Sequence, residues 1–253
     1  MQVNRWLRAA ACALTLTAAS PLLWAQEIVV SAAASLTNAF QAVGKAWSQA
    51  HPGHKATFNF AASGALLAQM QQGAPVDVFA SADQPTMDKA QAAGLIAQGT
   101  RSDFVKNELV LVVPAKSTKV PKSLDDLAGS AWQRIAAGTP ASVPVGRYTM
   151  SVIEQAKLDA PLKPKWIYGE SVRQVLDYVA RGEVDAGFVY RTDAMVKKDE
   201  TQVAFAVPTT TPVTYPIAQL AASKQPAAAQ SFIAFVKGAE GQKILQSFGF
   251  AQP

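Results

Sequence analysis

Four short segments of this chain combine small residues with the start of a helical pattern, which suits them to binding an anion. They cover residues 34–37, 60–65, 143–148 and 169–173. The first N–H groups of a helix lack partners inside it, and the helix dipole adds partial positive charge at that end. Such an end can hold an anion without a charged side chain. Capping alone would explain any one segment, with Ser35 and Ser63 expected as N-caps, but four segments together favour an anion site.

The four segments follow predicted strands in a chain that alternates between strand and helix. Short strands separated by helices favour parallel pairing through βαβ crossovers. The carboxyl ends of such strands are where ligands bind in open sheets. Asp83 is expected to cap the helix that runs through 87–93. The predicted strands are 27–31, 55–60, 76–80, 107–114, 134–138, 166–168, 184–190, 203–207 and 216–222; the predicted helices are 36–49, 64–72, 87–93, 123–127, 147–158, 172–181, 226–237 and 239–248.

The alternating strands and helices fall into two groups, which are joined near Asn107 and again near Pro212. This grouping predicts an α/β protein with two lobes and two crossings between them. We expect residues 26–107 to form the first lobe and 108–216 the second, with 217–253 returning to the first. Two of the four small-residue segments come from each lobe. A cleft between the lobes would therefore be lined by helix N-termini from both sides.

Several residues near these segments have other possible roles. Arg147 and Arg173 directly follow two helix starts, and we expect their long side chains to turn to solvent; a supporting role in raising the local potential is the alternative. Tyr190 by its position is an ordinary aromatic residue at a strand end. His51 and His54 flank Pro-Gly, which marks a surface turn, so we expect no metal site there.

Composition and charge narrow the class of protein. The chain has 253 residues, 49% hydrophobic and 16% charged, as in a globular protein. Residues 1–25 have a basic start, an apolar centre and a small residue at Ala25, the layout of a secretory signal peptide; a retained membrane anchor is the less favoured alternative. Removal of this segment leaves a net charge of +3, which argues against nucleic-acid binding. It also removes Cys12, the only cysteine, so no disulfide or thiol chemistry is expected.

The motifs of the chain, taken in order, resemble those of the periplasmic molybdate-binding proteins, the solute receptors of molybdate ABC importers. The resemblance implies a two-lobed Venus-flytrap fold of the type II binding-protein class, with a mostly parallel sheet flanked by helices in each lobe. It also implies an oxyanion held by neutral donors without a salt bridge. The motifs lie at residues 32–38, 60–64, 73–79, 81–83, 143–148, 171–173, 188–190 and 249–250.

The resemblance also implies which residues bind the ion. They are Ser35 and Ser63, through hydroxyl and backbone N–H groups, Val145 and Val172, through backbone N–H groups, and the hydroxyl of Tyr190. Molybdenum would be bound only as the oxyanion, and no separate cofactor is expected. Position 145 is usually alanine in this family. A backbone contact would survive the change to valine, although its bulk could alter the cavity wall.

The function implied is that of a periplasmic, monomeric receptor that captures molybdate, and also tungstate, for an inner-membrane permease. A site made only of donors would reject a protonated phosphate, whose hydrogen needs an acceptor. Receptors for sulfate, thiosulfate or ferric iron are alternatives within the class, as is a sensor that has lost transport. An exported serine hydrolase using Ser63 is disfavoured because both histidines lie together in one turn. We therefore expect a protein that is not an enzyme.

Overall fold

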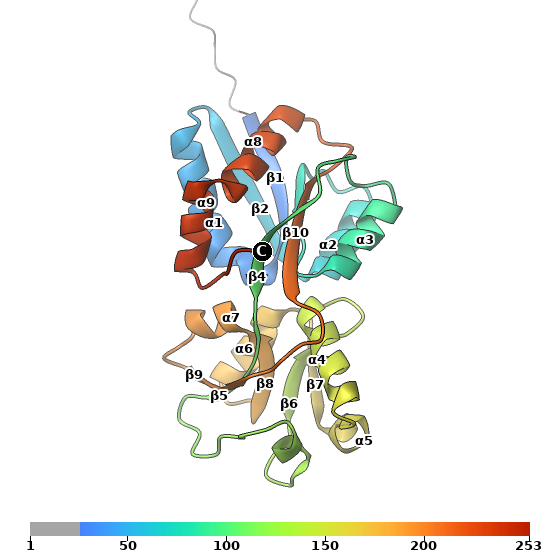
Figure 1. The fold of residues 1–253 in the computed structure, drawn as a ribbon, viewed down its shortest axis with the longest axis vertical. Coiled ribbons are helices and arrows are strands. Elements are labelled where there is room, and N and C mark those ends of the chain that lie inside the picture. Colours follow the sequence, from blue (N-terminus) through green and yellow to red (C-terminus); the bar gives the residue numbers. More distant parts are fainter. Residues whose placement is uncertain (1–25) are drawn as a thin grey trace, which may run out of the picture.

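The computed structural model describes residues 26–253, so the predicted signal peptide lies outside the described residues. Two lobes are stacked along the long axis of the molecule, and the chain crosses between them twice (Figure 1). Each lobe contains one five-stranded sheet flanked by helices. Within residues 26–253 no helix is both long enough and apolar enough to cross a bilayer.

The first lobe has the strand order β2-β1-β3-β10-β4. Helices α1, α8 and α9 cover one face of this sheet, and α2 and α3 cover the other (Figure 1). Phe40 and Trp47 of α1 pack edge-on against Phe232 of α8, as expected for the apolar face of an amphipathic helix. The bounds are β1 Gln26–Ala33, α1 Thr37–Ala50, β2 His54–Ala61, α2 Ser63–Gln71, β3 Val78–Ala80, α3 Gln84–Ala92, β4 Ser102–Asn107, β10 Val213–Gln219, α8 Pro226–Lys237 and α9 Ala239–Ser247.

The second lobe has the strand order β7-β6-β8-β5-β9. Helix α6 packs against β6 and β8, and α4 packs against β6. Three short 3₁₀ helices complete the elements of residues 26–253, η1 in the first lobe and η2 and η3 in the second. The bounds are η1 Ala34–Leu36, β5 Leu109–Pro114, η2 Asp125–Ala128, β6 Ile135–Gly138, α4 Pro144–Gln155, α5 Asp159–Leu162, η3 Lys163–Lys165, β7 Trp166–Gly169, α6 Val172–Ala180, β8 Ala186–Tyr190, α7 Arg191–Val196 and β9 Thr201–Ala206.

Both sheets are mixed rather than mostly parallel. In the first sheet, β1 pairs in parallel with β2 and β3, and β10 pairs antiparallel with β3 and β4. In the second sheet, β6 pairs in parallel with β7 and β8, and β5 pairs antiparallel with β8 and β9. The βα alternation in the sequence predicted the parallel part. Strands β10 and β5 run the other way because each enters its sheet from the opposite lobe. The carboxyl ends of the parallel strands consequently point toward the interface between the lobes (Figure 1).

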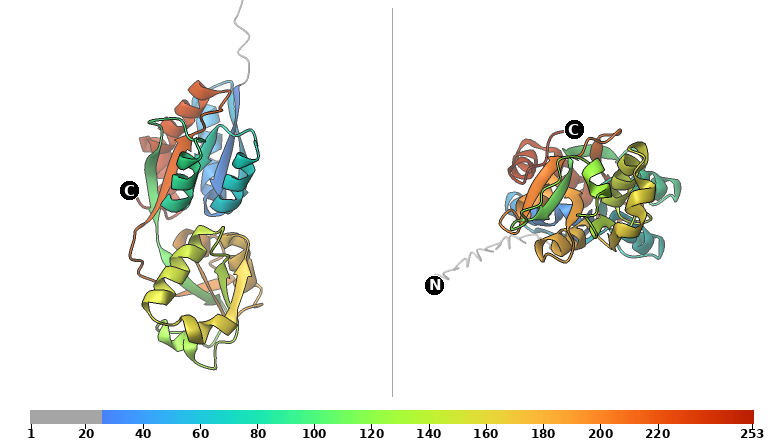
Figure 2. Two further views of the ribbon diagram at one scale, coloured as in Figure 1. Left: turned by 90° about the vertical axis from the view of Figure 1, so that its right-hand side faces the viewer. Right: turned by 90° about the horizontal axis from the view of Figure 1, so that it is seen from below.

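The two crossings lie side by side along one side of the molecule (Figure 2). The first is the single residue Glu108 between β4 and β5, and the second is the segment 207–212. Val213 already pairs with Asn107 of β4, so the chain is back in the first sheet before 217, where the sequence placed the return. The difference arises at Pro216, which lies inside β10 at a register shift next to Tyr215, a place where a strand tolerates proline.

Candidate functional site

A small cavity lies where the carboxyl ends of the parallel strands of both lobes face each other. Its volume is about 10 Å³, close to the roughly 10–15 Å³ that one water needs. None of the residues that line the cavity is charged. Four of the five predicted ligands are among them, and the fifth, Val145, is not. The lining residues are Ala33, Ala34, Ser35, Ala62, Ser63, Ala82, Val143, Pro144, Val172 and Tyr190.

Ser35 lies inside the 3₁₀ turn η1, immediately before α1. Its buried hydroxyl is 2.9 Å from the hydroxyl of Tyr215 in β10. The prediction that Ser35 caps the helix is wrong, because η1 precedes α1 and makes Leu36 its N-cap. The side chain is therefore held by a partner from the far end of the chain, not by its own helix.

Ser63 is the first residue of α2, after the N-cap Ala62, so the prediction that Ser63 caps this helix is also wrong. Its buried hydroxyl oxygen accepts a hydrogen bond of 3.0 Å from the backbone N–H of Ala82. The next residue, Gly64, donates its N–H across the interface to the carbonyl of Ser142 at 2.9 Å. The start of α2 thus touches the second lobe directly.

Val145 and Val172 are the second residue of α4 and the first residue of α6. At these positions a backbone N–H has no acceptor within its own helix. In residues 26–253 no backbone acceptor outside the helices reaches them either. The α6 end is capped by Ser171, whose hydroxyl accepts from the N–H of Gln174 at 3.2 Å. Both helix starts leave N–H groups free for a ligand.

The side chain of Val145 is fully buried, and it packs against the backbone of β6. A Cβ placed on Gly138 would lie only 3.0 Å from Val145 Cγ1, so the two residues are in close contact. Val145 is absent from the cavity lining, whereas Val143 and Pro144 of the same turn belong to it. The extra bulk of valine therefore goes into the core of the second lobe.

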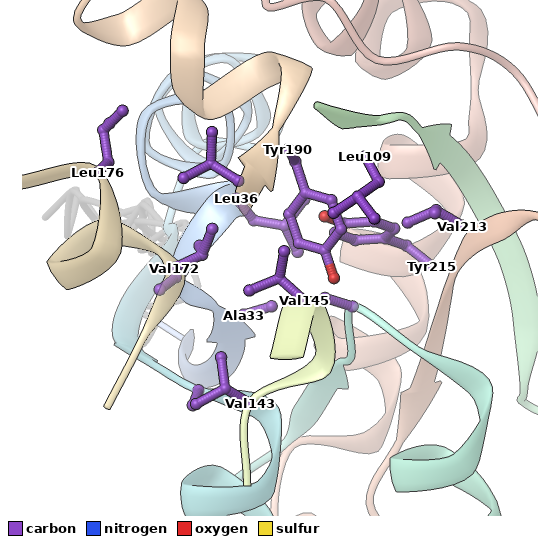
Figure 3. Close-up of a cluster of buried hydrophobic side chains, with 14 of the residues drawn as sticks. Ala33, Leu36, Leu109, Val143, Val145, Val172, Leu176, Tyr190, Val213 and Tyr215 are labelled. Carbon is purple, nitrogen blue, oxygen red and sulfur yellow. The ribbon is translucent and has the colours of Figure 1, made fainter. Parts of the chain in front are cut away.

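Tyr190, at the end of β8, brings a hydroxyl to this cavity that has no hydrogen-bond partner within residues 26–253. The side chain is 1% exposed, and its ring lies edge-on to that of Tyr215, with ring centroids 5.8 Å apart (Figure 3). Burial raises the pKa of Tyr190 well above its ordinary value, so the group stays a neutral O–H donor. A buried donor without an acceptor is costly unless a ligand supplies one.

Both arginines next to the site form ion pairs, and the prediction that they turn to solvent is wrong. Arg147 lies 2.7 Å from the carboxylate of Asp83, which caps α3 as predicted, and donates to Thr86 Oγ1. Arg173 Nε lies 2.6 Å from Asp193 Oδ1. The two carboxylates are almost completely buried, and a buried charge needs a partner. Each guanidinium neutralises an aspartate and lies outside the cavity lining.

Residues 28–251 match the family model of the bacterial extracellular solute-binding proteins. The chain belongs to this family. It is 38% identical to molybdate-binding protein ModA of Mycobacterium tuberculosis over 237 residues, which cover 93% of this chain and 88% of that protein. These matches confirm the resemblance predicted from the motifs.

Solved structures confirm the predicted two-lobed fold. The periplasmic molybdate-binding protein of Azotobacter vinelandii superimposes with a TM-score of 0.77 at 24% identity, over 89% of this chain and 99% of that one. The sulfate-binding protein SubI of Mycobacterium tuberculosis gives 0.79 at 19% identity, over 90% and 87%. At such identities the likeness concerns the fold alone.

Three residues of this solute-binding protein that are bonded to site residues or to their neighbours were not predicted from the sequence as part of the site: Asn107, Asp193 and Tyr215. Asn107 donates from Nδ2 to Thr192 Oγ1 at 2.8 Å and to the hydroxyl of Tyr215 at 3.2 Å. The signal for Tyr215 was available, because the apolar residues Val213, Tyr215 and Ile217 recur at every second position, the spacing of one face of a strand, and all three are buried. Asp193 carries no such signal, since it lies in the short helix α7, which has no strong pattern.

Proposed function

We propose that this protein binds molybdate, and also tungstate, in the cavity between its lobes and delivers the ion to an ABC permease. The observation that carries the proposal is the uncharged cavity itself, where Ser35 and Ser63 of one lobe meet Val172 and Tyr190 of the other. The unpartnered hydroxyl of Tyr190 is what an oxyanion would satisfy. The molybdate-binding name of the relative from Mycobacterium tuberculosis supports the choice of ion.

The donor set fits a tetrahedral dianion. Removing a charge from water costs several kcal/mol or more unless many donors replace the hydration shell. We assign this role to the hydroxyls of Ser35, Ser63 and Tyr190, to their neighbouring N–H groups, and to the backbone N–H groups of Val145 and Val172. Fixed N–H groups at helix starts supply positive potential without burying a counter-charge. The nearby arginines are neutralised by Asp83 and Asp193 and take no part.

The size of the cavity argues against an organic solute. Sites for organic ligands usually enclose about 300–1,000 Å³, whereas this cavity measures about 10 Å³. Sulfate is the rival candidate, because it is also an unprotonated tetrahedral dianion. The sulfate-binding structure shares the fold, so the fold does not separate the two ions.

We propose a transport role in the periplasm and no enzymatic activity. The family is one of extracellular solute-binding proteins, which agrees with export by the predicted signal peptide. Ser63 is not arranged as a nucleophile, since its oxygen accepts from a backbone N–H and no base among residues 26–253 is hydrogen-bonded to it. Closure of the lobes around the ion would give the permease a shape to recognise.

Calorimetry on residues 26–253 with molybdate, tungstate, sulfate and hydrogen phosphate tests the proposal. We expect tight binding of molybdate and tungstate, weaker binding of sulfate and the weakest binding of phosphate. Ser35→Ala and Ser63→Ala should each weaken molybdate binding by about 1.5–3 kcal/mol, because each removes a donor to a charged ligand. Ser117→Ala, which changes an exposed hydroxyl bonded to the carbonyl of Lys119, is the control. Sulfate bound as tightly as molybdate, or unchanged affinity in both site variants, would overturn the proposal.

A further inference from the structure

A chain of hydrogen bonds runs from the first crossing between the lobes to the cavity. The backbone N–H of Glu108 donates to Asn107 Oδ1 at 2.9 Å. Asn107 Nδ2 donates to the hydroxyl of Tyr215 at 3.2 Å, and that hydroxyl lies 2.9 Å from Ser35 Oγ. Ser35 in turn lines the cavity. These hydrogen bonds join the backbone of Glu108, at the first crossing, to Ser35, a proposed ligand of the ion.

The direction of this chain is fixed at its start. A backbone N–H can only donate, so the amide oxygen of Asn107 must face Glu108. The amide nitrogen of Asn107 therefore faces Tyr215, and it too can only donate. The Tyr215 oxygen accepts this bond, and Ser35 Oγ is the remaining partner for its proton. Because an unpaired buried hydroxyl proton is costly, Tyr215 donates to Ser35.

The consequence concerns the proton of Ser35 itself. We propose that Asn107 and Tyr215 hold the Ser35 hydroxyl as a proton donor toward the cavity, and that this polarity rejects protonated oxyanions such as hydrogen phosphate. The inference rests on the function proposed above and names its specificity-determining contacts. Ser63 is fixed in the same sense, since its oxygen accepts from the N–H of Ala82 and its proton is free. Both serines then face the ion as donors.

Hydrogen phosphate differs from molybdate in carrying a hydroxyl that needs an acceptor. A serine that is free to rotate would turn a lone pair toward that hydroxyl and bind it. A serine whose oxygen already accepts from Tyr215 has one lone pair left, and turning that lone pair to the cavity would leave the serine's own proton without an acceptor, since Tyr215 is the one partner of Ser35 Oγ within residues 26–253. Burial also raises the pKa of Tyr215 well above its ordinary value, against the lowering effect of its bonds to Ser35 and Asn107, so its proton stays in place. Asn107 and Tyr215 are thus positioning residues.

Two substitutions alter this chain of hydrogen bonds in different ways. Tyr215→Phe removes the donor to Ser35 and leaves that hydroxyl free to accept. Asn107→Asp reverses the chain, because a carboxylate oxygen facing Tyr215 accepts its proton, and Ser35 must then donate to Tyr215 and turn lone pairs to the cavity. Asn38→Asp is the matched control: Asn38 lies with Ser35 along a neighbouring groove, so it adds the same charge near the site without entering the chain.

The test measures the ratio of the dissociation constants for phosphate and molybdate by competition calorimetry, in mildly alkaline buffer where phosphate is a dianion. We expect Tyr215→Phe to lower this ratio about tenfold and Asn107→Asp to lower it further, because each exchanges a donor for an acceptor. Asn38→Asp should weaken both dianions alike and leave the ratio unchanged. Thermal unfolding of each variant shows that it is folded, and if Tyr215→Phe fails to fold, Asn107→Asp decides alone.

The outcomes separate this inference from the function on which it rests. If the parent binds molybdate, and the phosphate-to-molybdate ratio is unchanged in every folded variant of Asn107 and Tyr215, the inference is overturned and the proposed function stays intact. An equal drop of the ratio in Asn38→Asp would also overturn it, because charge alone would then explain the effect. A parent protein that binds neither molybdate nor sulfate would overturn both.

Discussion

Arg147 of α4 and Asp83, the cap of α3, form a partly buried ion pair across the interface between the two lobes. The nitrogen and oxygen atoms are 2.7 Å apart, and the aspartate side chain is only 2% exposed. The same guanidinium donates to Thr86 Oγ1 at 2.7 Å and to the carbonyl groups of Pro140 and Ala141 at 3.2 Å. One arginine thus ties a loop of the second lobe to a helix start of the first, which favours the closed arrangement of the lobes.

Arg147→Met should weaken molybdate binding by about 1–3 kcal/mol, because it leaves the carboxylate of Asp83 buried without a counter-charge whenever the lobes are closed. Small-angle scattering of the ligand-free variant should show a more extended molecule than the parent. Arg181→Met serves as the control, because Arg181 pairs with Glu183 at 3.7 Å where both side chains are exposed. Equal affinity and equal dimensions in Arg147→Met and the parent would show that the pair does not favour closure.

Gly64→Ala should lower affinity without lowering the stability of the first lobe. An added Cβ would lie 2.5 Å from the carbonyl oxygen of Ser142 and 2.8 Å from its Cα, both backbone atoms of the other lobe. The methyl group therefore separates the lobes, whereas alanine is by itself a better helix residue than glycine. Calorimetry and denaturant unfolding measure the two effects. Gly129→Ala, distant from the interface, is the control, and unchanged molybdate affinity in Gly64→Ala would contradict this account of closure.

Tyr190→Phe should have opposite effects on binding and on the ligand-free fold. Without the ion the Tyr190 hydroxyl is buried and unpartnered, so its removal should leave the free energy of unfolding unchanged or slightly raised. With the ion a donor is lost, and affinity should fall about 10- to 100-fold. Urea unfolding with and without molybdate reads both. Tyr178→Phe, in a half-buried tyrosine of α6, is the control; a loss of stability without a loss of affinity would remove Tyr190 from the site.

Asp193 gives the protein a specific dependence of stability on pH. Burial raises the pKa of this carboxyl from 3.8 to about 6, although Arg173 opposes the shift. The folded chain therefore holds a proton that the unfolded chain has lost, so stability falls as the pH rises from 3.8 to about 6, by about 3 kcal/mol in total. Below this range the contribution is fully present.

Asp193→Asn should abolish this slope, which urea unfolding of parent and variant across the same range measures. Asp177→Asn, in a carboxylate of α6 that pairs with Lys197 at 2.8 Å and is 38% exposed, should keep the parent's slope. If the parent instead becomes more stable relative to Asp193→Asn as the pH rises, then the ion pair with Arg173 lowers the pKa of Asp193 more than burial raises it.

The sequence predicted the parts of the site that depend on local pattern. Strand-to-helix alternation located the starts of α2 and α6, which carry Ser63 and Val172, because small residues and caps at such corners are set by neighbouring residues. Helix α4 begins at Pro144, before the predicted start at 147, so Val145 lies inside the helix. The rest depends on partners that are distant along the chain. Ser35 lies 180 positions from Tyr215, and Arg147 lies 64 from Asp83. No local pattern in the sequence shows that folding brings these distant residues into contact.

The same limit explains the errors about side chains. Ser35 and Ser63 fit the N-cap preference, but tertiary partners, Tyr215 and the N–H of Ala82, determine where their hydroxyls point. Arg147 and Arg173 follow helix starts and have stems long enough to reach solvent. Their side chains instead turn toward Asp83 and Asp193, because these carboxylates are buried beside them in the folded protein. The sequence alone does not show this proximity.

We propose that an oxyanion is held between the lobes by neutral donors. Crystals grown with tungstate would reveal such an ion, because the tungsten atom can be located by its anomalous scattering. We predict one strong peak in the cavity between the lobes, with the hydroxyls of Ser35, Ser63 and Tyr190 directed at the surrounding oxygens. A peak beside the guanidinium of Arg147 or Arg173, or an empty cavity in crystals with tungstate bound elsewhere, would contradict the account.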